Sequence, residues 1–573
     1  MKKIIICFIT LGFLLSSCMD VLDKTKLDSI SEDYVWQDEV LCTAYVNRLY
    51  MYFPLFNTGL ADATDEATGG GTWLDGSLSP DNPIKIQSPG ESGGDKRYWK
   101  YDYIRQANIF IKNINDRSLT SIDESIANRL SLEARFIRAS IYFEMVKWYG
   151  GVPLLTEPQD LPDNFDELLV TRESTKKCFD FVIEELKACV DGLPESYDAN
   201  NLGRVTKAAA MAFLGRVHLF RASPQFNPGN SAELWNTAYN YNKQTLDYLS
   251  SKGYGLVTDM EYGDIFLNEM NKEVVFAIRF VNPGRVHTED AGIRPITHAQ
   301  NNNGKCHPIQ KVIDSWPTAD GKKFTINDIK EGEDITNLWK NRDKRFYEVI
   351  VYHGSSYLDI PSMEMNQNAQ NGYAYGKNNG SKTGYYSKKF INQSYSINDA
   401  SNSGTDYIDI RYAEVMLNFA EAAVETGNQS EAFNVLSQIR DRAGITKTVA
   451  DDPELVGKEY GLNPNMNKEE MRQAVRDERY IELLFERKRI WDLRRWGVYH
   501  EMMVGKGKRN ALVLTKEDNG SLSWYLFDRD NTPMISDERI YFLPLSQADE
   551  INKNSKLQQN KGWGGTFDPL EGL

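Results

Sequence analysis

The chain has 573 residues, which allows two to four domains of ordinary size. Its formal net charge at pH 7 is −15, and an acidic surface of that size repels nucleic acid and anionic membrane, so we expect no nucleic-acid partner. Six cysteines in so long a chain do not make a disulfide-stapled scaffold.

The first eighteen residues have the organisation of a secretory signal. Two lysines precede an apolar run of 12 residues (4–15), and the run closes on LSSC, which ends at Cys18. A helix needs about 20 apolar residues to span a bilayer, so this run is too short to be an anchor. LSSC resembles a bacterial lipobox. We therefore predict a lipoprotein signal at 1–17, a lipidated Cys18 and a polar tether at 18–30; the alternative is an ordinary signal peptide with an incidental cysteine.

Helical periodicity dominates the N-terminal region, which we place at 31–250. The small residues Ala208, Ala209, Ala212 and Gly215 predict a helix face that a neighbouring helix approaches closely. The predicted helices cover residues 31–57, 96–116, 175–190 and 234–249, and two more fall within the blocks 131–155, where Gly150-Gly151 stops the helix, and 203–224. Cys178 and Cys189 lie on one of these helices, about 16 Å apart at 1.5 Å per residue, so they cannot form a disulfide.

The next region, 251–405, has a different sequence pattern. Short alternating runs such as EVVFAIRF (273–280) and RFYEVIVYHG (345–354) are broken by Gly, Asn and Pro, which predicts strands and long loops. Helical periodicity returns in the C-terminal region, 406–573. There RYAEVMLNFAEAAVETGN and SEAFNVLSQIRDRAG predict two helices joined by a short turn. Stacked helical hairpins of this kind are typical of tetratricopeptide-like folds, although the strict 34-residue signature is absent.

Several sequence blocks follow the order in which one family carries them. Three C-terminal blocks are RYAEVMLNFAEA (411–422), ERYIELLFERKRIWDLRRWG (478–497) and YFLPLSQADEINKNSKLQQN (541–560). Two N-terminal blocks are EARFIRASIYFEMVKWYGGVPLL (133–155) and GRVTKAAAMAFLGRVHLFRASP (203–224). Together they resemble the SusD/RagB family over nearly the whole mature chain. Arg487 departs from the pattern, because the family often has glycine there.

The resemblance implies a fold, a location and a role. The expected fold is mainly α, with tetratricopeptide-like helical hairpins and a loop-rich, partly β middle lobe. The expected protein is a surface lipoprotein of the Bacteroidetes outer membrane, lipid-anchored and facing outward. It is expected to bind oligosaccharide, or peptide in some members, as the lid of a SusC-type TonB-dependent transporter, without catalysing a reaction and without a cofactor.

Two loops carry the candidate ligand contacts, because in the family such contacts come from the N-terminal loops and the middle lobe. GGGTWLDGS places Trp73 and Asp75 on a glycine-rich loop, and Asn302 and Asn303 precede the proline turn of Trp316. An indole ring can cover the C–H face of a sugar, and amides and carboxylates can bond its hydroxyl groups. Each tryptophan has a second interpretation, in which the ring anchors its loop in the core.

Other charged residues suggest further roles. Asp62 and Asp65 either line the same cleft or bind a structural calcium ion. Within 478–497, Arg479–Glu482 and Glu486–Arg489 have the i,i+3 spacing of helical ion pairs. Arginines of this block are also expected to reach carboxylates of the neighbouring helix, at Glu414 or Glu421, and so to fasten two hairpins together.

Two rival functions come from other classes. GESGG matches the G-x-S-x-G pattern with Ser92 at its centre, but no buried strand precedes it, which argues against a nucleophile elbow. A surface glycoside hydrolase needs two carboxylates about 5–10 Å apart, and no local motif proposes such a pair. The other rival is a helical scaffold that binds only proteins.

Overall fold

The computed structural model describes most of the chain after the first thirty-one residues. The described residues are 32–53, 58–68, 77–83, 98–160, 164–299, 305–370, 372–377, 380–505, 508–529, 535 and 537–573. The predicted signal, tether and Cys18 therefore lie outside the described residues.

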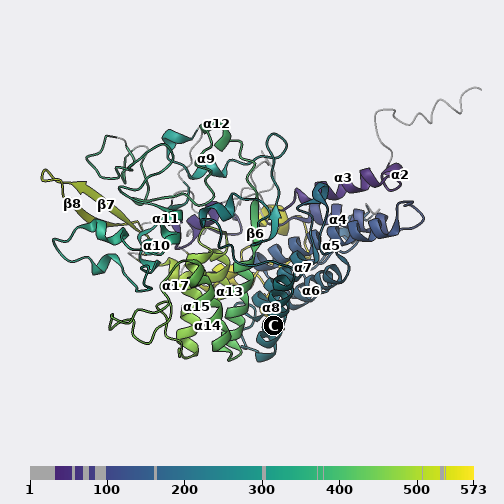
Figure 1. The fold of residues 1–573 in the computed structure, drawn as a ribbon. Helices are drawn as coiled ribbons and strands as arrows, with labels where there is room; N and C mark the ends of the chain where they lie inside the picture. The colour runs from purple at the N-terminus through teal and green to yellow at the C-terminus, as the bar shows by residue number, and fades with distance from the viewer. Residues whose placement is uncertain are drawn as a thin grey trace, which may run out of the picture.

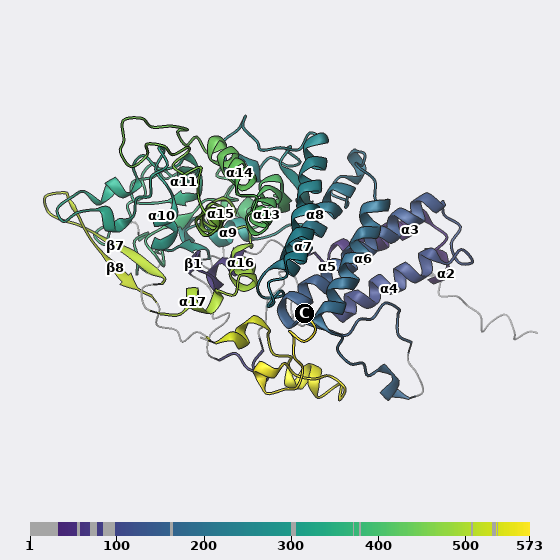
Figure 2. The same cartoon turned by 90° about the horizontal axis from the view of Figure 1, so that it is seen from below.

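The N-terminal half is a row of helices, each packed on the next (Figures 1 and 2). Its principal helices are α3 (Glu39–Tyr50), α4 (Tyr101–Asn115), α5 (Glu124–Tyr149), α6 (Thr175–Gly192), α7 (Lys207–Ala222) and α8 (Ala232–Ser251). Side-chain oxygens cap the helices whose starts the sequence predicts: Ser174 accepts from Lys177 N, and Thr206 accepts from Ala209 N. The single helix predicted at 31–57 is instead two, α2 (Glu32–Val35) and α3, because Asp38 starts a new helix as its cap.

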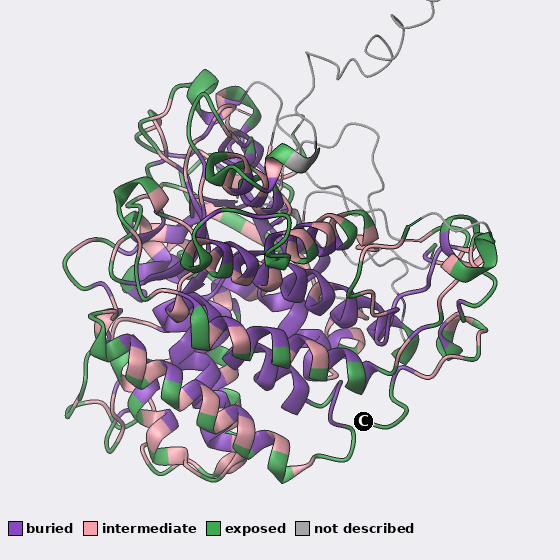
Figure 3. Cartoon of the chain, turned by 90° about the vertical axis from the view of Figure 1, so that its right-hand side faces the viewer, coloured by how far each residue is buried: buried purple, intermediate pink, exposed green. Residues whose placement is uncertain are grey.

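The C-terminal helices continue the same row. α13 (Tyr412–Glu425) packs on α8, and α14 (Gln429–Arg442) and α15 (Lys468–Glu482) pack on α13. Figure 3 shows buried residues on the inward sides of the helices and exposed residues on the outside of the body. The mainly α fold of stacked hairpins is confirmed. Within the described ranges, no helix combines the length and hydropathy that crossing a membrane requires.

The small residues of α7 do allow close approach, as predicted. Gly215 lies against α8, and a Cβ atom built on it would stand 2.7 Å from Asn242 Oδ1. The Asn242 amide donates to the backbone oxygens of Gly215 (3.0 Å) and Ala238 (2.8 Å). The contact between these two helices therefore depends on the missing side chain.

The middle region is a lobe of short elements and loops, as predicted. Its elements are β2 (Val274–Ile278), α9 (Glu289–Ile293), β3 (His307–Pro308), α10 (Gln310–Ser315), α11 (Lys344–Val349), β4 (Ile350–Val351), β5 (Tyr386–Ser387) and α12 (Ile397–Ala400). The run at 345–354 was expected as a strand but begins as helix α11. Asp343 accounts for this difference, because its carboxylate caps the helix by accepting from Arg345 N (2.9 Å).

Strand pairing joins the three regions. β1 (Ala67–Thr68) of the N-terminal region pairs with β3, and β2 pairs with β6 (Tyr407–Arg411) of the C-terminal region, both antiparallel. A hairpin of β7 (Asn510–Lys516) and β8 (Leu522–Asp528) projects from the middle lobe at the far end from α2 (Figure 1). The last residues return to the N-terminal helices, where Thr175 Oγ1 donates to Pro569 O at 2.6 Å (Figure 2).

Buried ion pairs hold the C-terminal helices to the lobe. Glu482 Oε1 accepts from Arg411 (2.6 Å) and Arg442 (2.5 Å), and Glu482 Oε2 accepts from Arg345 (2.6 Å). All four side chains are nearly inaccessible to solvent. The three arginines come from three different parts of the chain, so one carboxylate links them.

The predicted i,i+3 pairs are wrong. Arg479 pairs with Asp492 (2.7 Å), Glu486 pairs with Arg411 and Lys389, and Arg489 pairs with Asp65. The block is not one helix: α15 ends at Glu482 and α16 (Arg489–Arg495) starts seven residues later.

The predicted fastening of two hairpins is confirmed. Arg495 donates to both carboxylate oxygens of Glu421 on α13, at 2.5 and 2.6 Å. Glu414 is also paired across elements, although its partners are Arg216 (2.8 Å) and Lys488 (3.2 Å). These charged residues of the C-terminal block are therefore structural.

Candidate ligand-binding site

The β1–β3 ladder holds the bases of the two predicted loops together. Thr68 is opposite His307, and Ala67 is opposite Pro308. Because the ladder is antiparallel, the chain that follows Thr68 and the chain that precedes His307 leave at the same end. These are the directions of the loop that carries Trp73 and the loop that carries Asn303.

Four of the predicted contacts fall in those loops. Trp73, Asp75, Asn302 and Asn303 lie outside the described residues, so their role as ligand contacts stays a prediction. Ser92 also lies outside them. The structure thus brings together the two loop bases, which the sequence alone did not relate to one another.

The fifth predicted contact, Trp316, is a core residue. Its side chain is 1% exposed at the end of α10, where Phe346 meets it edge to face at 6.1 Å. The Arg345 guanidinium lies 5.8 Å from its ring centroid. No ring face is open to a sugar, so the platform interpretation of Trp316 is wrong and the anchoring interpretation is correct.

The other end of the ladder carries a charged cluster. Asp65 accepts two hydrogen bonds from Arg489 (2.7 and 2.8 Å) and one from Lys311 Nζ (2.6 Å). These two cations hold the pKa of Asp65 well below its usual range, although burial of the carboxylate opposes the shift. At the loop end, Asp62 accepts from Cys306 N at 3.2 Å. The two aspartates therefore position the ladder.

This cluster does not favour calcium, because two cations already bind the Asp65 oxygens. In the described part of the chain, no three His, Cys, Asp or Glu side chains gather as a metal site. Four cysteines in these ranges, Cys42, Cys178, Cys189 and Cys306, are buried and free, so the prediction that Cys178 and Cys189 do not pair is confirmed.

Glu66 is a buried acid directly before β1. Its side chain is 1% exposed, and burial raises its pKa to about 8 against the effect of a hydrogen bond from Phe485 N at 3.1 Å. Its backbone oxygen accepts from Ile309 N, which extends the ladder by one bond. At neutral pH the carboxyl is mostly protonated, so this end of the ladder carries less negative charge than the sequence indicates.

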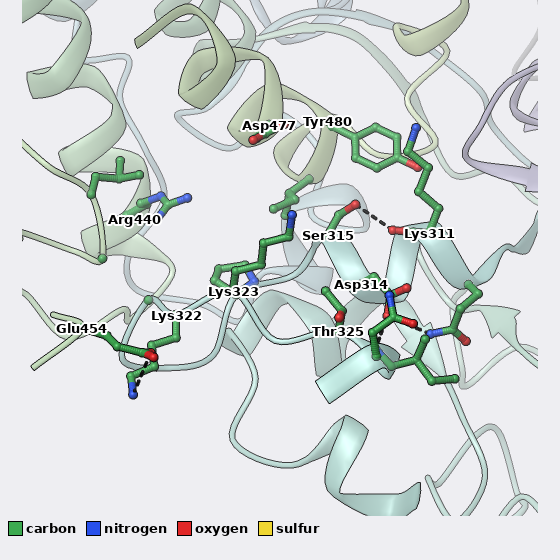
Figure 4. Close-up of a pocket in the computed structure, with 18 of the residues that line it drawn as sticks. Lys311, Asp314, Ser315, Lys322, Lys323, Thr325, Arg440, Glu454, Asp477 and Tyr480 are labelled. Carbon is green, nitrogen blue, oxygen red and sulfur yellow. Dashed lines mark hydrogen bonds and ion pairs between the residues drawn. The ribbon is translucent and has the colours of Figure 1, made fainter. Parts of the chain in front are cut away.

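A large cleft opens beside this charged end (Figure 4). Its volume is about 1010 Å³, and its walls come from α10, the turn at 317–327, the loop at 454–462, α15 and the β7–β8 hairpin. Lys311 and Tyr480 belong to the wall nearest the ladder, where the Tyr480 hydroxyl donates to Asp65 O at 2.5 Å. The cleft thus lies at the end of the ladder opposite to Thr68 and His307, where the chain leaves toward the predicted loops.

The cleft is polar but has no evident catalytic arrangement. Burial raises the pKa of two lining acids, Asp314 and Asp477. Asp314 Oδ1 accepts from Gln310 and from Ile326 N, both at 2.9 Å, and Asp477 accepts from Gln473 at 2.7 Å. These bonds give both acids a structural role. Among its described lining residues there is no histidine or cysteine.

Comparison with known proteins decides the family. The profile of the SusD family matches residues 272–563, and a profile described as starch-binding associating with outer membrane matches residues 94–219. This chain belongs to the SusD family. A SusD-like protein of Formosa agariphila is 22% identical over 98% of this chain and 100% of its own.

Solved structures show the same fold. A SusD-like protein of Bacteroides fragilis has a TM-score of 0.73 and 28% identity, with 94% of this chain and 99% of that one covered. The surface glycan-binding protein A of Bacteroides thetaiotaomicron, in complex with laminarihexaose, has a TM-score of 0.60 at 17% identity, with 91% and 99% covered. At that identity the second likeness shows the fold alone.

The SusD-family fold also explains the departure at Arg487. Its φ is +62°, in the left-handed region that glycine adopts without strain. The guanidinium lies 5.7 Å from the ring centroid of Tyr407. The sequence shows only that arginine stands where the family often has glycine. The structure shows that Arg487 adopts the left-handed backbone conformation that glycine favours.

Proposed function

We propose that this SusD-family protein binds oligosaccharide outside the cell and delivers it to a SusC-type TonB-dependent transporter, as the lid of that transporter. The observation that carries the proposal is the β1–β3 ladder, which puts the bases of the two predicted ligand loops side by side. The family descriptions and the laminarihexaose complex of a structural neighbour support a saccharide ligand.

The loops suit a sugar better than the cleft does. A sugar ring presents an apolar face and hydroxyl edges, which a flat aromatic ring and polar side chains together satisfy. Trp73 supplies a ring, and Asp75, Asn302 and Asn303 supply polar groups. In the cleft, the aromatic lining residue is Tyr480, which is 6% exposed and whose hydroxyl is already bonded.

Isothermal titration of the mature chain against a panel of neutral soluble polysaccharides tests this site. Trp73→Ala and Asn303→Ala are each expected to weaken binding about tenfold or more, because each removes part of the ring or edge recognition. Asn327→Ala, an exposed amide in the cleft, is the matched control and is expected to bind like wild type.

A loss of binding in Asn327→Ala with wild-type affinity in both loop variants would place the ligand in the cleft instead. Binding of peptides but not saccharides would indicate a RagB-type ligand. If the protein binds neither saccharides nor peptides but still co-purifies with a barrel protein, it is a scaffold that binds only proteins. No saccharide in the panel is expected to be cleaved, which an assay for new reducing ends checks.

The anchoring part of the proposal rests on Cys18. A diacylglycerol on the Cys18 sulfur, together with a further acyl chain, would hold the mature chain at the membrane, because stable anchoring takes more than one chain. Co-purification with a TonB-dependent transporter from outer membranes tests the partner. Capture of the transporter by wild type but not by Cys18→Ala in whole cells is the expected result.

A further inference from the structure

A second pocket opens where α3 ends, next to the η3 turn (Ala199–Asn201) and strand β2. It shares no described lining residue with the cleft. Its volume is about 240 Å³, against about 1010 Å³ for the cleft. That volume suits one small group, such as a single sugar unit, and not a long oligosaccharide.

The charges that line this pocket are all positive. Arg204, Arg279 and Arg285 line it, and none of its described lining residues is an aspartate or glutamate. This is notable in a chain with 81 acidic and 66 basic residues, whose surface as a whole repels anions.

Two of the three arginines are neutralised by the protein. Arg204 Nη1 donates to Glu133 at 2.8 Å, and its other nitrogens donate to the side-chain oxygens of Asn201 and Asn47. Arg279 forms ion pairs at 2.9 Å with Glu269 and with Asp406. These two groups hold the walls of the pocket together.

Arg285 has no such carboxylate in the described part of the chain. Its Nε and Nη2 atoms are buried without a hydrogen-bond acceptor, and Nη1 reaches only the backbone oxygen of Arg279, at 3.5 Å. The guanidinium lies 4.7 Å from the ring centroid of Phe280. Burial lowers the pKa of Arg285, and no acid is near enough to oppose that shift.

A partly buried cation without a counter-ion is costly, and a bound anion removes the cost. A guanidinium presents a planar fork of N–H donors that matches the oxygens of a carboxylate or a sulfate. Asn47 and Asn200 are exposed at the same pocket and add amide donors. The lining therefore offers exposed amide donors and a net positive charge to whatever enters.

We propose that this pocket binds the oxyanion of an acidic sugar unit, a carboxylate or a sulfate, on Arg285. The preference for an anion follows from the pocket alone. The assignment of that anion to a sugar rests on the proposed function.

Calorimetric titration of the mature chain at low salt tests the proposal. The probes are galacturonate, galactose 6-sulfate, uncharged galactose and inorganic sulfate. Wild type is expected to bind both charged sugars and not galactose, and inorganic sulfate is expected to compete. Arg285→Gln is expected to weaken binding of the charged sugars at least tenfold, whereas Arg539→Gln, an arginine outside the pocket, leaves it unchanged. Added salt is expected to weaken binding in wild type.

Thermal unfolding of both variants shows whether they remain folded, and Arg285→Lys is a second variant that keeps the charge and loses the fork. An intermediate affinity in Arg285→Lys supports the proposal. Equal affinity for galactose and galacturonate, unchanged binding in folded Arg285→Gln, or no binding of either charged sugar would overturn it.

The same titrations separate this proposal from the loop site. One outcome is that neutral polysaccharides bind with an affinity that falls in Trp73→Ala, while the affinity for the charged sugars is unchanged in Arg285→Gln. In that case the pocket proposal fails and the proposed function stands. If the charged sugars depend on Arg285 and no polysaccharide binds, the anion site stands and the proposed function fails.

Discussion

At the scale of single residues, Glu482 shows how one buried carboxylate links several parts of the chain. Three arginines donate to it, all in the interior. They hold its pKa well below the usual range, although burial of the carboxylate acts in the opposite direction. Its removal would take one partner from Arg345 and from Arg411 and would leave Arg442 with Glu273 at 3.4 Å, and breaking such a buried pair typically costs about 3–5 kcal/mol.

Glu482→Gln is therefore expected to lower the free energy of unfolding by about 3–5 kcal/mol, measured by urea denaturation. Glu469→Gln is the matched control, because its side chain is 79% exposed and pairs with Arg472 at the surface. That change is expected to cost less than about 1 kcal/mol. Equal losses in the two variants would show that the buried network contributes no more than a surface pair.

Glu66 leads to a pH-dependent prediction, because its pKa is raised where that of Glu482 is lowered. Replacing it is therefore expected to stabilise the protein at neutral pH. Its folded pKa is about 8 against an ordinary value of 4.5, so the folded state resists ionisation and loses stability as pH rises between these values. Glu66→Gln resembles the protonated acid. It is expected to match wild type near pH 4 and to exceed it by on the order of 3 kcal/mol at pH 7.

Urea midpoints of the two proteins from pH 4 to pH 9 measure this difference. A constant difference across the whole range would mean that Glu66 ionises normally. The comparison also tests the charged end of the β1–β3 ladder, because Glu66 and Asp65 are adjacent and only Asp65 is held ionised by cations.

At the scale of elements, Gly215 shows how a helix contact depends on one missing side chain. Gly215→Val is expected to push Asn242 from its two backbone bonds and to cost on the order of 2 kcal/mol by overpacking. Gly229→Ala is the control, because nothing lies within 4 Å of the added atom. Circular dichroism with thermal unfolding measures both; similar melting temperatures would contradict the close α7–α8 contact.

Element prediction succeeded where one residue pattern decided the structure. The apolar faces of α6, α7 and α13 and the capping residues of α6 and α7 can be recognised in the sequence, because helical period and capping act locally. The ion pairs were mispredicted because they depend on the residue at which a helix ends. Phe485 and Arg487 adopt positive φ between α15 and α16, and no local sequence pattern indicates that the helix ends there.

The β7–β8 hairpin was not predicted, although the sequence indicates it. β8 alternates between partly buried and exposed residues, and Asn519-Gly520, with Gly520 at φ +84°, lies between the two strands, which is a strong hairpin indicator. The site was only partly predictable for a different reason. A sequence proposes Trp73 and Asn303 as loop residues, but only the pairing of Thr68 with His307 relates the two loops.

At the scale of the whole molecule, stacked helices form a body on which a lobe of loops is built. The N-terminal region supplies β1, the lobe supplies β3, and the last residues of the chain return to α6. A loop site built on such a frame is free to change its ligand without changing the fold, since function resides in the site and not in the scaffold.

Binding of a fluorescent form of the best-bound polysaccharide to intact cells tests the central claim most directly. Cells that carry the wild-type protein are expected to be labelled. Labelling is expected to be lost both in Cys18→Ala, which removes the proposed lipid anchor, and in the Trp73→Ala, Asn303→Ala double variant, which removes the proposed ligand contacts. Undiminished labelling in either variant, with equal protein in the cells, would contradict an anchored, outward-facing glycan-binding protein.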